Sequence, residues 1–227
     1  MDQKPTTLHT VCLPDPGLVV NAPDHMSCFP ACIQMAMRTH AGGPVYAFDQ
    51  IDALSHRETG LYSWEYGVLA DLAAHGYQIK RFNLFDVQAF VNKGADYLIE
   101  FYGPDVEQDQ VHHTNIPATI ETARAFLAQK NISQHPTSPE IQDIWQGIDA
   151  GYYAIIAIDQ CRYLNKPGTD SHVIFAYGYN ARGIVFHNPG PPPQRASEMS
   201  WEQLIRCWDR PSKEQREMYL IQAPLIA

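Results

Sequence analysis

The sequence predicts an α+β fold, with an N-terminal helical lobe followed by a C-terminal antiparallel sheet. Three observations predict it: a helix-forming segment follows a proline-broken loop near the N-terminus, apolar residues recur at helical spacing through the middle third, and short β-type runs separated by turn residues fill the last third. With 227 residues, 45% of them hydrophobic and 18% charged, the chain fits one large domain spanning residues 1–227.

The N-terminal part predicts two helices and a strand. Prolines and a glycine break residues 11–24, so that a loop leads to the first helix, at about residues 29–40. Pro30 lies where a first helical turn tolerates proline, and Gly42-Gly43-Pro44 ends the helix. A second helix with a glycine stop and a short strand are expected next, at residues 64–75 and 77–82.

The middle and last thirds differ in character. Three stretches with helical spacing predict a helical insertion at about residues 85–150; they are Asp86–Lys93, Ile116–Gln129 and Pro139–Ala150. Short β-type runs then predict the strands Tyr152–Asp159, Ser171–Tyr179, Ile184–Asn188 and Met218–Ala223. Ser200, followed by Glu202 and Gln203, is typical of a capped helix start.

Charge and composition exclude several classes of partner. The net charge of −9, without a basic run, argues against nucleic acid and anionic membranes. No apolar run approaches the roughly 18 residues of a membrane span, and the polar N-terminus lacks the features of a secretory signal, so we expect a cytoplasmic protein. The adjacent His112 and His113 point apart and read as a surface pair, so no metal or cofactor is expected. The oligomeric state is left open.

Cys28 is the candidate nucleophile. Five scattered cysteines, an odd number, indicate reduced thiols. Cys28 immediately precedes a predicted helix, where unpaired amides and the helix dipole favour a thiolate, and beside a histidine we expect its pKa to fall to about 3.5–7.5. The alternative is a small apolar residue buried at a helix start. Cys32, one turn later, lies inside the helix and is expected to be core.

His172 and Asn188 are the candidate base and its orienting residue. His172 enters one predicted strand and Asn188 leaves the next. The link Asn180-Ala181-Arg182-Gly183 predicts a three-residue bulged loop with Gly183 in the left-handed region. That loop pairs Asn188 with Ala176, on the His172 face, whereas a two-residue loop would place it on the opposite face.

Cys28-Phe29-Pro30-Ala31, Ser171-His172-Val173 and His187-Asn188-Pro189, in this order, resemble papain-like cysteine peptidases. The similarity is to the branch that includes bacteriocin leader-processing (double-glycine) peptidases, and it covers about residues 17–44 and 150–222. It implies a papain-like fold and a Cys28-His172-Asn188 triad. Two positions depart from the pattern: Phe29 replaces a glycine, and Ala22 replaces the oxyanion-hole glutamine, so Asn21 is the substitute candidate beside the Cys28 amide.

The resemblance implies acyl transfer, with a peptide or other amide as substrate and Cys28 as attacking thiolate. The same apparatus serves peptidases, amidases, transglutaminases and acyltransferases, and the sequence does not choose among them. A rival from another class is a catalytically degenerate papain-like domain that binds a peptide in the cleft. Phe29 and the missing glutamine favour that rival.

Overall fold

The computed structural model describes residues 9–23, 25–58, 61–62, 64–103, 111–209 and 212–224. The strands are β1 (Val11–Cys12), β2 (Gln78–Phe82), β3 (Ile132–His135), β4 (Tyr153–Asp159), β5 (Ser171–Tyr179), β6 (Gly183–Asn188), β7 (Gln194–Ser200) and β8 (Met218–Gln222). The α-helices are α1 (Cys28–Arg38), α2 (Phe48–Leu54), α3 (Tyr66–Ala74), α4 (Val87–Lys93), α5 (Ala95–Tyr102), α7 (Ile116–Leu127), α8 (Ile141–Asp149), α9 (Gln160–Tyr163) and α10 (Trp201–Trp208).

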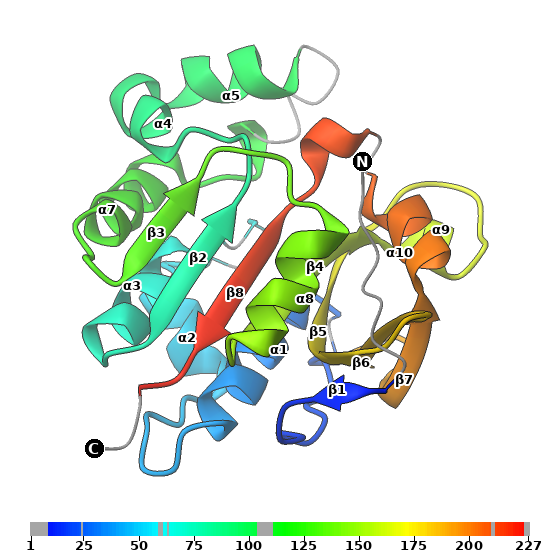
Figure 1. The fold of residues 1–227 in the computed structure, drawn as a ribbon. Helices are drawn as coiled ribbons and strands as arrows, with labels where there is room; N and C mark the ends of the chain where they lie inside the picture. The colour runs from blue at the N-terminus through cyan, green and yellow to red at the C-terminus, as the bar shows by residue number, and fades with distance from the viewer. Residues whose placement is uncertain are drawn as a thin grey trace.

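The strands of the described residues form one eight-stranded sheet (Figure 1). Its order is β3-β2-β8-β4-β5-β6-β7, and β1 pairs with β5. The β2–β3 pair is parallel, whereas the other pairs between described strands are antiparallel. The protein is therefore an α+β protein with a mostly antiparallel sheet, as the sequence predicts.

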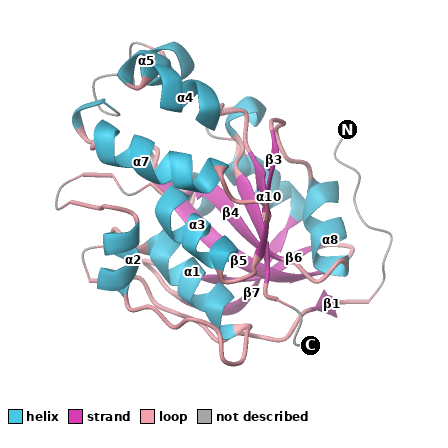
Figure 2. Ribbon diagram, turned by 90° about the vertical axis from the view of Figure 1, so that its left-hand side faces the viewer, coloured by secondary structure: helices cyan, strands magenta, loops and turns pink. Residues whose placement is uncertain are grey.

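Helices cover both faces of this sheet (Figure 2). On one face, α1, α2, α3 and α7 share an apolar core with inward residues of the sheet such as Phe175. On the other face, α8 and α10 pack against a second core that includes Ile174 and Trp201. Neighbouring residues of β5 thus point to opposite cores, as the period of two in a strand requires. By the same alternation, His172 belongs to the face of Ile174.

Most predicted elements are confirmed within one or two residues at each end. The first helix starts at Cys28 rather than after it, and β5 has the predicted bounds, Ser171–Tyr179. Ser200 caps α10, since its hydroxyl accepts a hydrogen bond from the Gln203 amide at 3.1 Å. Helices α2, α5 and α9 and strands β1, β3 and β7 were not predicted.

The expected helical insertion at about residues 85–150 is only partly helical. Helices α4, α5 and α7 lie in it, but β3 follows them and pairs with β2, and α8 packs on the sheet. The sheet also extends beyond the C-terminal third, because β2 pairs with the C-terminal β8. The predicted separation into a helical lobe and a sheet is therefore too simple, since strands from all thirds of the chain meet in one sheet.

The N-terminal arm, residues 9–23, runs along the sheet toward Cys28. After β1, the Pro14 carbonyl accepts a hydrogen bond from the Tyr153 hydroxyl at 3.0 Å. Asp15 then contacts the buried His187, with 2.7 Å between its Oδ1 and the ring Nε2. These contacts hold the arm in place up to the residues that precede α1.

The register between β5 and β6 corrects the predicted hairpin. Tyr179 pairs with Ile184, and the Asn180 amide donates to the Gly183 carbonyl at 2.8 Å, so the loop has two residues, Ala181 and Arg182. The φ of Gly183 lies outside the left-handed region. The predicted three-residue loop is therefore wrong. The irregularity occurs instead within β5, between Ala176 and Gly178. It shifts the register by one residue, so that Phe175 pairs with His187.

This shift places Asn188 on the face of His172, which is the outcome predicted from a three-residue loop. If the register is continued, Asn188 lies opposite Ile174, on the face of His172. Without the bulge, the two-residue loop would place Asn188 on the other face. Gly183 is required for another reason: a Cβ there would lie 1.8 Å from the carbonyl oxygen of Met199 in β7.

We expect Gly183→Ala to lower the free energy of unfolding by about 3 kcal/mol or more, because a methyl group would overpack the β6–β7 backbone contact. Gly42→Ala is the matched control. Gly42 has a φ of +82° and nothing within 4 Å of its Cβ position, so only the conformational strain of about 1–2 kcal/mol applies. Urea unfolding measures both. A larger loss for Gly42→Ala would contradict the close-approach explanation.

Candidate active site

Cys28 begins α1, and its thiol is held against the start of β5. Backbone amides of Val173, Phe29 and Cys28 itself lie close enough to the sulfur to favour its ionised form and lower its pKa. The last two belong to the first turn of the helix, whose amides have no partner within the helix. The sequence-based expectation that the helix start would surround the thiol with amide donors agrees with this geometry.

Burial and these amides have opposite effects on the pKa of the Cys28 thiol. Removal from water is the largest effect on Cys28 and raises its pKa, the three amides lower it by less, and the negative charge of Asp170 raises it further. The pKa of the thiol therefore lies above its ordinary value of 9.0. The expected thiolate with a lowered pKa is wrong for this resting structure, in which Cys28 is a neutral thiol.

His172 and Asn188 form a buried hydrogen-bonded pair. His172 Nε2 lies 2.7 Å from Asn188 Oδ1, and the two residues are 4% and 0% exposed. The backbone amide of Gly190 also donates to Oδ1, at 2.8 Å. Of the two ends of an asparagine side-chain amide, only the oxygen can accept from a backbone N–H, so this contact fixes which end of Asn188 faces the ring.

The tautomer of His172 follows from this contact. Because Oδ1 is an acceptor, Nε2 must carry the hydrogen, which leaves the lone pair of the neutral ring on Nδ1. Burial is the largest influence on His172 and lowers its pKa, although the Asn188 hydrogen bond and Asp170 act in the opposite direction. The ring is therefore neutral near pH 7, with Nδ1 available as a base.

Cys28 and His172 meet at the same end of β5 from opposite sides. The sulfur contacts the amide of Val173, the residue next to His172. Helix α1 packs on the Phe175 face, whereas His172 belongs to the Ile174 face. Among the described residues, no hydrogen bond joins the sulfur to the imidazole. The structure thus brings Cys28, the candidate nucleophile, and His172, the candidate base, to the same end of β5 without a hydrogen bond between them.

Asn21 has a different role from the predicted one. Its Oδ1 accepts from the Ser27 amide at 2.8 Å, and its Nδ2 donates to the carbonyls of His25 and Gly190, each at 3.1 Å. Both amide hydrogens are therefore engaged, and the prediction of Asn21 as an oxyanion donor is corrected. Asn21 instead ties the residue before Cys28 to the loop after Asn188.

Phe29 lies beside a polar cluster that sequence reasoning missed. Its ring contacts that of Tyr219 edge-on, with 5.6 Å between centroids. The Tyr219 hydroxyl contacts carboxyl oxygens of both Glu65 and Glu217, and Arg81 Nε lies 3.9 Å from Glu65. One hydroxyl hydrogen serves only one of these contacts, so the other needs a carboxyl proton. Burial and the charge of Glu217 accordingly raise the pKa of Glu65.

The other singled-out residues lie outside this arrangement. Cys32 is fully buried in the α1 core, as expected, and all five cysteines of the chain are free. The His113 carbonyl accepts from the Tyr62 amide, at 2.6 Å. In the described ranges, no group of three His, Cys, Asp or Glu side chains is placed to hold a metal. No helix among the described residues is long and apolar enough to cross a bilayer.

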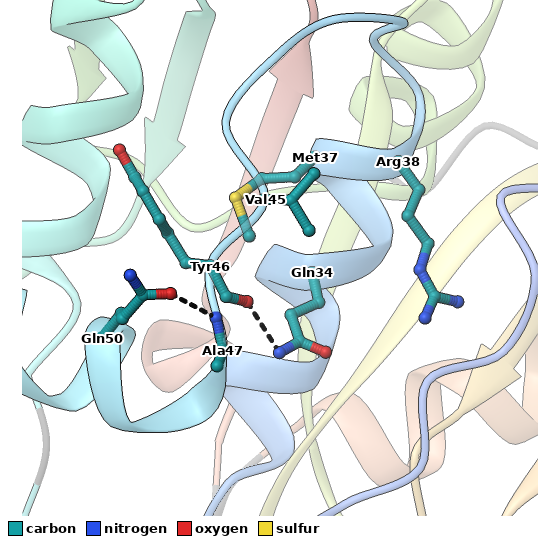
Figure 3. A pocket seen from close by; sticks show the side chains of 7 residues that line it. All are labelled: Gln34, Met37, Arg38, Val45, Tyr46, Ala47 and Gln50. Carbon is teal, nitrogen blue, oxygen red and sulfur yellow. Dashed lines mark hydrogen bonds between the residues drawn. The ribbon is translucent and has the colours of Figure 1, made fainter.

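A hollow of about 310 Å³ lies at the other end of α1 (Figure 3). Met37 and Val45 form its apolar side, and Gln34 closes part of it by donating to the Tyr46 carbonyl at 2.8 Å. Cys28 is about 15 Å away along the helix axis, at 1.5 Å per residue. The hollow contains neither a cysteine nor a histidine, and therefore offers no nucleophile for covalent chemistry.

No protein-family model, curated protein or solved structure matches this chain significantly.

We expect Asn21→Ala to destabilise the protein by about 1–3 kcal/mol, because it leaves the amide of buried Ser27 without its acceptor. Asn21→Asp keeps that acceptor and should cost less. Thermal and urea unfolding measure both variants. An unchanged stability together with slower chemistry at Cys28 would instead favour the oxyanion role.

Proposed function

We propose that the protein is a papain-like cysteine hydrolase that cleaves a peptide or amide bond by acyl transfer. Cys28 is the nucleophile, His172 the base and Asn188 the residue that orients it. The observation that carries the proposal is the His172–Asn188 pair, because Gly190 fixes the amide and thereby leaves Nδ1 as the basic nitrogen. A histidine held in one tautomer beside a helix-start cysteine is the arrangement that general-base activation of a thiol requires.

The topology gives further support to the papain-like reading. The nucleophile begins a helix that packs against the histidine strand, and the histidine and asparagine lie on adjacent antiparallel strands. The chain order Cys, His, Asn and the helix-to-strand contact agree with the resemblance of Cys28-Phe29-Pro30-Ala31 and His187-Asn188-Pro189. The helices on the second sheet face and the strand β3 are additions to that arrangement.

The reaction begins with a neutral thiol and a neutral imidazole. The resting structure shows no hydrogen bond between the two groups among the described residues, so the reaction requires the His172 ring to turn toward the sulfur at the start of β5. The Cys28 sulfur then attacks the substrate carbonyl carbon while its proton passes to His172 Nδ1. The C–N bond of the tetrahedral intermediate then breaks, and Nδ1 returns the proton to the leaving amine. A water molecule, deprotonated by Nδ1, attacks the thioester, and the departing sulfur recovers its proton. The product is a carboxylic acid.

Charge on the carbonyl oxygen needs a donor. With the Asn21 amide engaged, the backbone amide of Cys28 is the remaining candidate, although in the resting structure it acts on the Cys28 sulfur and would have to turn to the carbonyl oxygen. Loss of one oxyanion donor typically lowers the rate by about 10²–10³. We therefore expect a slow hydrolase, or one in which the substrate supplies the second donor.

The second candidate is a papain-like domain that binds a peptide without cleaving it. Specific observations favour it: burial raises the pKa of Cys28, no hydrogen bond joins its sulfur to His172 among the described residues, and a bulky Phe29 follows Cys28 where the resembled family has a glycine. The two candidates differ in whether the reactivity of Cys28 depends on His172.

We expect alkylation of Cys28 by iodoacetamide, followed by peptide mass spectrometry, to show base assistance by His172. Since the pKa of His172 is lowered, the neutral ring persists below pH 6.5, and the rate should fall only as the pH drops through that lowered pKa. In His172→Ala the raised pKa of the thiol governs instead, so the rate should rise only toward and above pH 9. At pH 7 the variant should be slower by about 10².

Asn188→Ala should lie between these two profiles, because it loosens the imidazole without removing it. Its measurement uses the same alkylation series from about pH 5 to 9. If wild type and His172→Ala alkylate with the same pH profile, the base is not coupled to the thiol, and the peptide-binding domain becomes the better interpretation.

A further inference from the structure

The residue at the start of α9, Gln160, lies beside the candidate catalytic pair. Ile158 pairs with His172 and Asp159 with Ser171, and the Gln160 amide continues this ladder by donating to the Asp170 carbonyl at 2.8 Å. The backbone of Gln160 is thus one step beyond His172, on the β4 side of β5. By alternation along β4, its side chain leaves on the same face as Ile158 and His172.

The side chain of Gln160 ends on the other side of β5. Its Nε2 donates to the carbonyl of Pro191, three residues after Asn188, at 2.5 Å. The side chain therefore crosses the beginning of β5 on the face where His172 and Asn188 lie. Gln160 is only 4% exposed, so this crossing is part of the buried interior.

Two buried polar atoms in this region have no partner among the described residues. They are the Oε1 of Gln160, an acceptor, and the Nδ2 of Asn188, a donor. A buried polar group without a hydrogen bond loses its bonds to water without replacement, so two such groups on neighbouring segments are unfavourable when left apart. They are complementary, and one hydrogen bond, or one water that accepts from Nδ2 and donates to Oε1, satisfies both.

We propose that Gln160 is a positioning residue for the candidate active site. Its Oε1 accepts a hydrogen bond from Nδ2 of Asn188, directly or through one water, while its own Nε2 continues to donate to the Pro191 carbonyl. The Asn188 amide is then held at both ends: Oδ1 by Gly190 and His172, and Nδ2 by Gln160. The role in catalysis rests on the proposed function, whereas the hydrogen bond to Asn188 does not.

Gln160 adds to the contacts that prevent the Asn188 side-chain amide from rotating by 180°. Rotation of the amide by 180° would bring Nδ2 against Nε2–H of His172 and the Gly190 amide, and so oppose donors to donors. A partner that accepts only from Nδ2 raises the free energy of that rotated state. The His172 tautomer with a hydrogen on Nε2, and hence the basic Nδ1, is therefore protected by Gln160.

The test compares three substitutions on the full chain. Gln160→Met keeps the length of the side chain and removes both polar atoms. Gln160→Glu restores an acceptor for Asn188, and its other oxygen donates to the Pro191 carbonyl when the buried carboxyl is protonated. Gln222→Met is the matched control, because Gln222 Nε2 also donates to a backbone carbonyl, that of Ala150, at 2.9 Å. Gln222 lies at the end of β8 that pairs with Gln78, away from His172.

The readouts are the ¹⁵N resonances of the Asn188 side-chain amide and the His172 ring, and the rate of Cys28 alkylation at pH 7. In Gln160→Met, we expect the Asn188 amide resonance to shift, the His172 ring nitrogens to lose part of their Nε2–H tautomer signature, and the alkylation rate to fall by about tenfold. Gln160→Glu should recover most of both signals, and Gln222→Met should change neither.

Unchanged Asn188 and His172 resonances in Gln160→Met would overturn the proposal, whatever the alkylation rate. If that variant does not fold, the wild type decides: a hydrogen-bonded Asn188 amide proton exchanges slowly with solvent, and a freely exchanging one overturns the proposal. Should the resonances shift as expected while His172→Ala leaves Cys28 alkylation unchanged, the Gln160–Asn188 contact stands and the hydrolase proposal fails.

Discussion

The arrangement of the candidate site depends on one oxygen atom, Oδ1 of Asn188, which accepts from both His172 and Gly190. The Gly190 amide decides that this atom is oxygen, the oxygen decides that His172 Nε2 is protonated, and the proton decides that Nδ1 is the base. Each step is a matter of donor and acceptor identity rather than of fine distance. A histidine without such a neighbour would distribute its hydrogen between both nitrogens and lose part of its basic form at the required position.

That oxygen reaches His172 only because of the strand register. The loop between β5 and β6 has two residues, Ala181 and Arg182, and this loop alone would direct Asn188 to the opposite face of the sheet. The irregularity between Ala176 and Gly178 shifts the pairing by one residue and reverses that outcome. A bulge placed near a site re-aims side chains in this way. Here it serves the same purpose as the loop that the sequence suggested, from a different position.

The sequence predicted the strands and the principal helices because their signals are local. Apolar runs and capping residues specify β5 and α10 without reference to the rest of the chain. Chain order also predicted contacts among Cys28, His172 and Asn188; the structure shows the His172–Asn188 contact, whereas no hydrogen bond joins Cys28 to His172 among the described residues. Strand β3 was not predicted, because Ile132–His135 is short and polar and is extended only through its pairing with β2. The role of Asn21 also depends on Gly190, 169 residues away, which no local pattern reveals.

The polar cluster beside Phe29 shows another limit of local reasoning. Arg81 occupies an inward position of β2, on the face of Ile79, and a charged residue there was a signal that a buried partner exists. The partners, Glu65 and Glu217, come from segments separated by more than 150 residues, and neither is unusual in its own segment. Only the sheet order, which places β2 next to β8, brings them together.

The energetics of the resting site favour neutral partners over an ion pair. The ordinary values, 9.0 for the thiol and 6.5 for the imidazole, already differ by about 2.5 pKa units, or about 3.4 kcal/mol, and burial moves the two pKa values further apart. Proton transfer from Cys28 to His172 is therefore unfavourable before substrate arrives. It becomes feasible when it accompanies formation of the carbon–sulfur bond, because the negative charge then passes to the carbonyl oxygen rather than remaining on a buried sulfur.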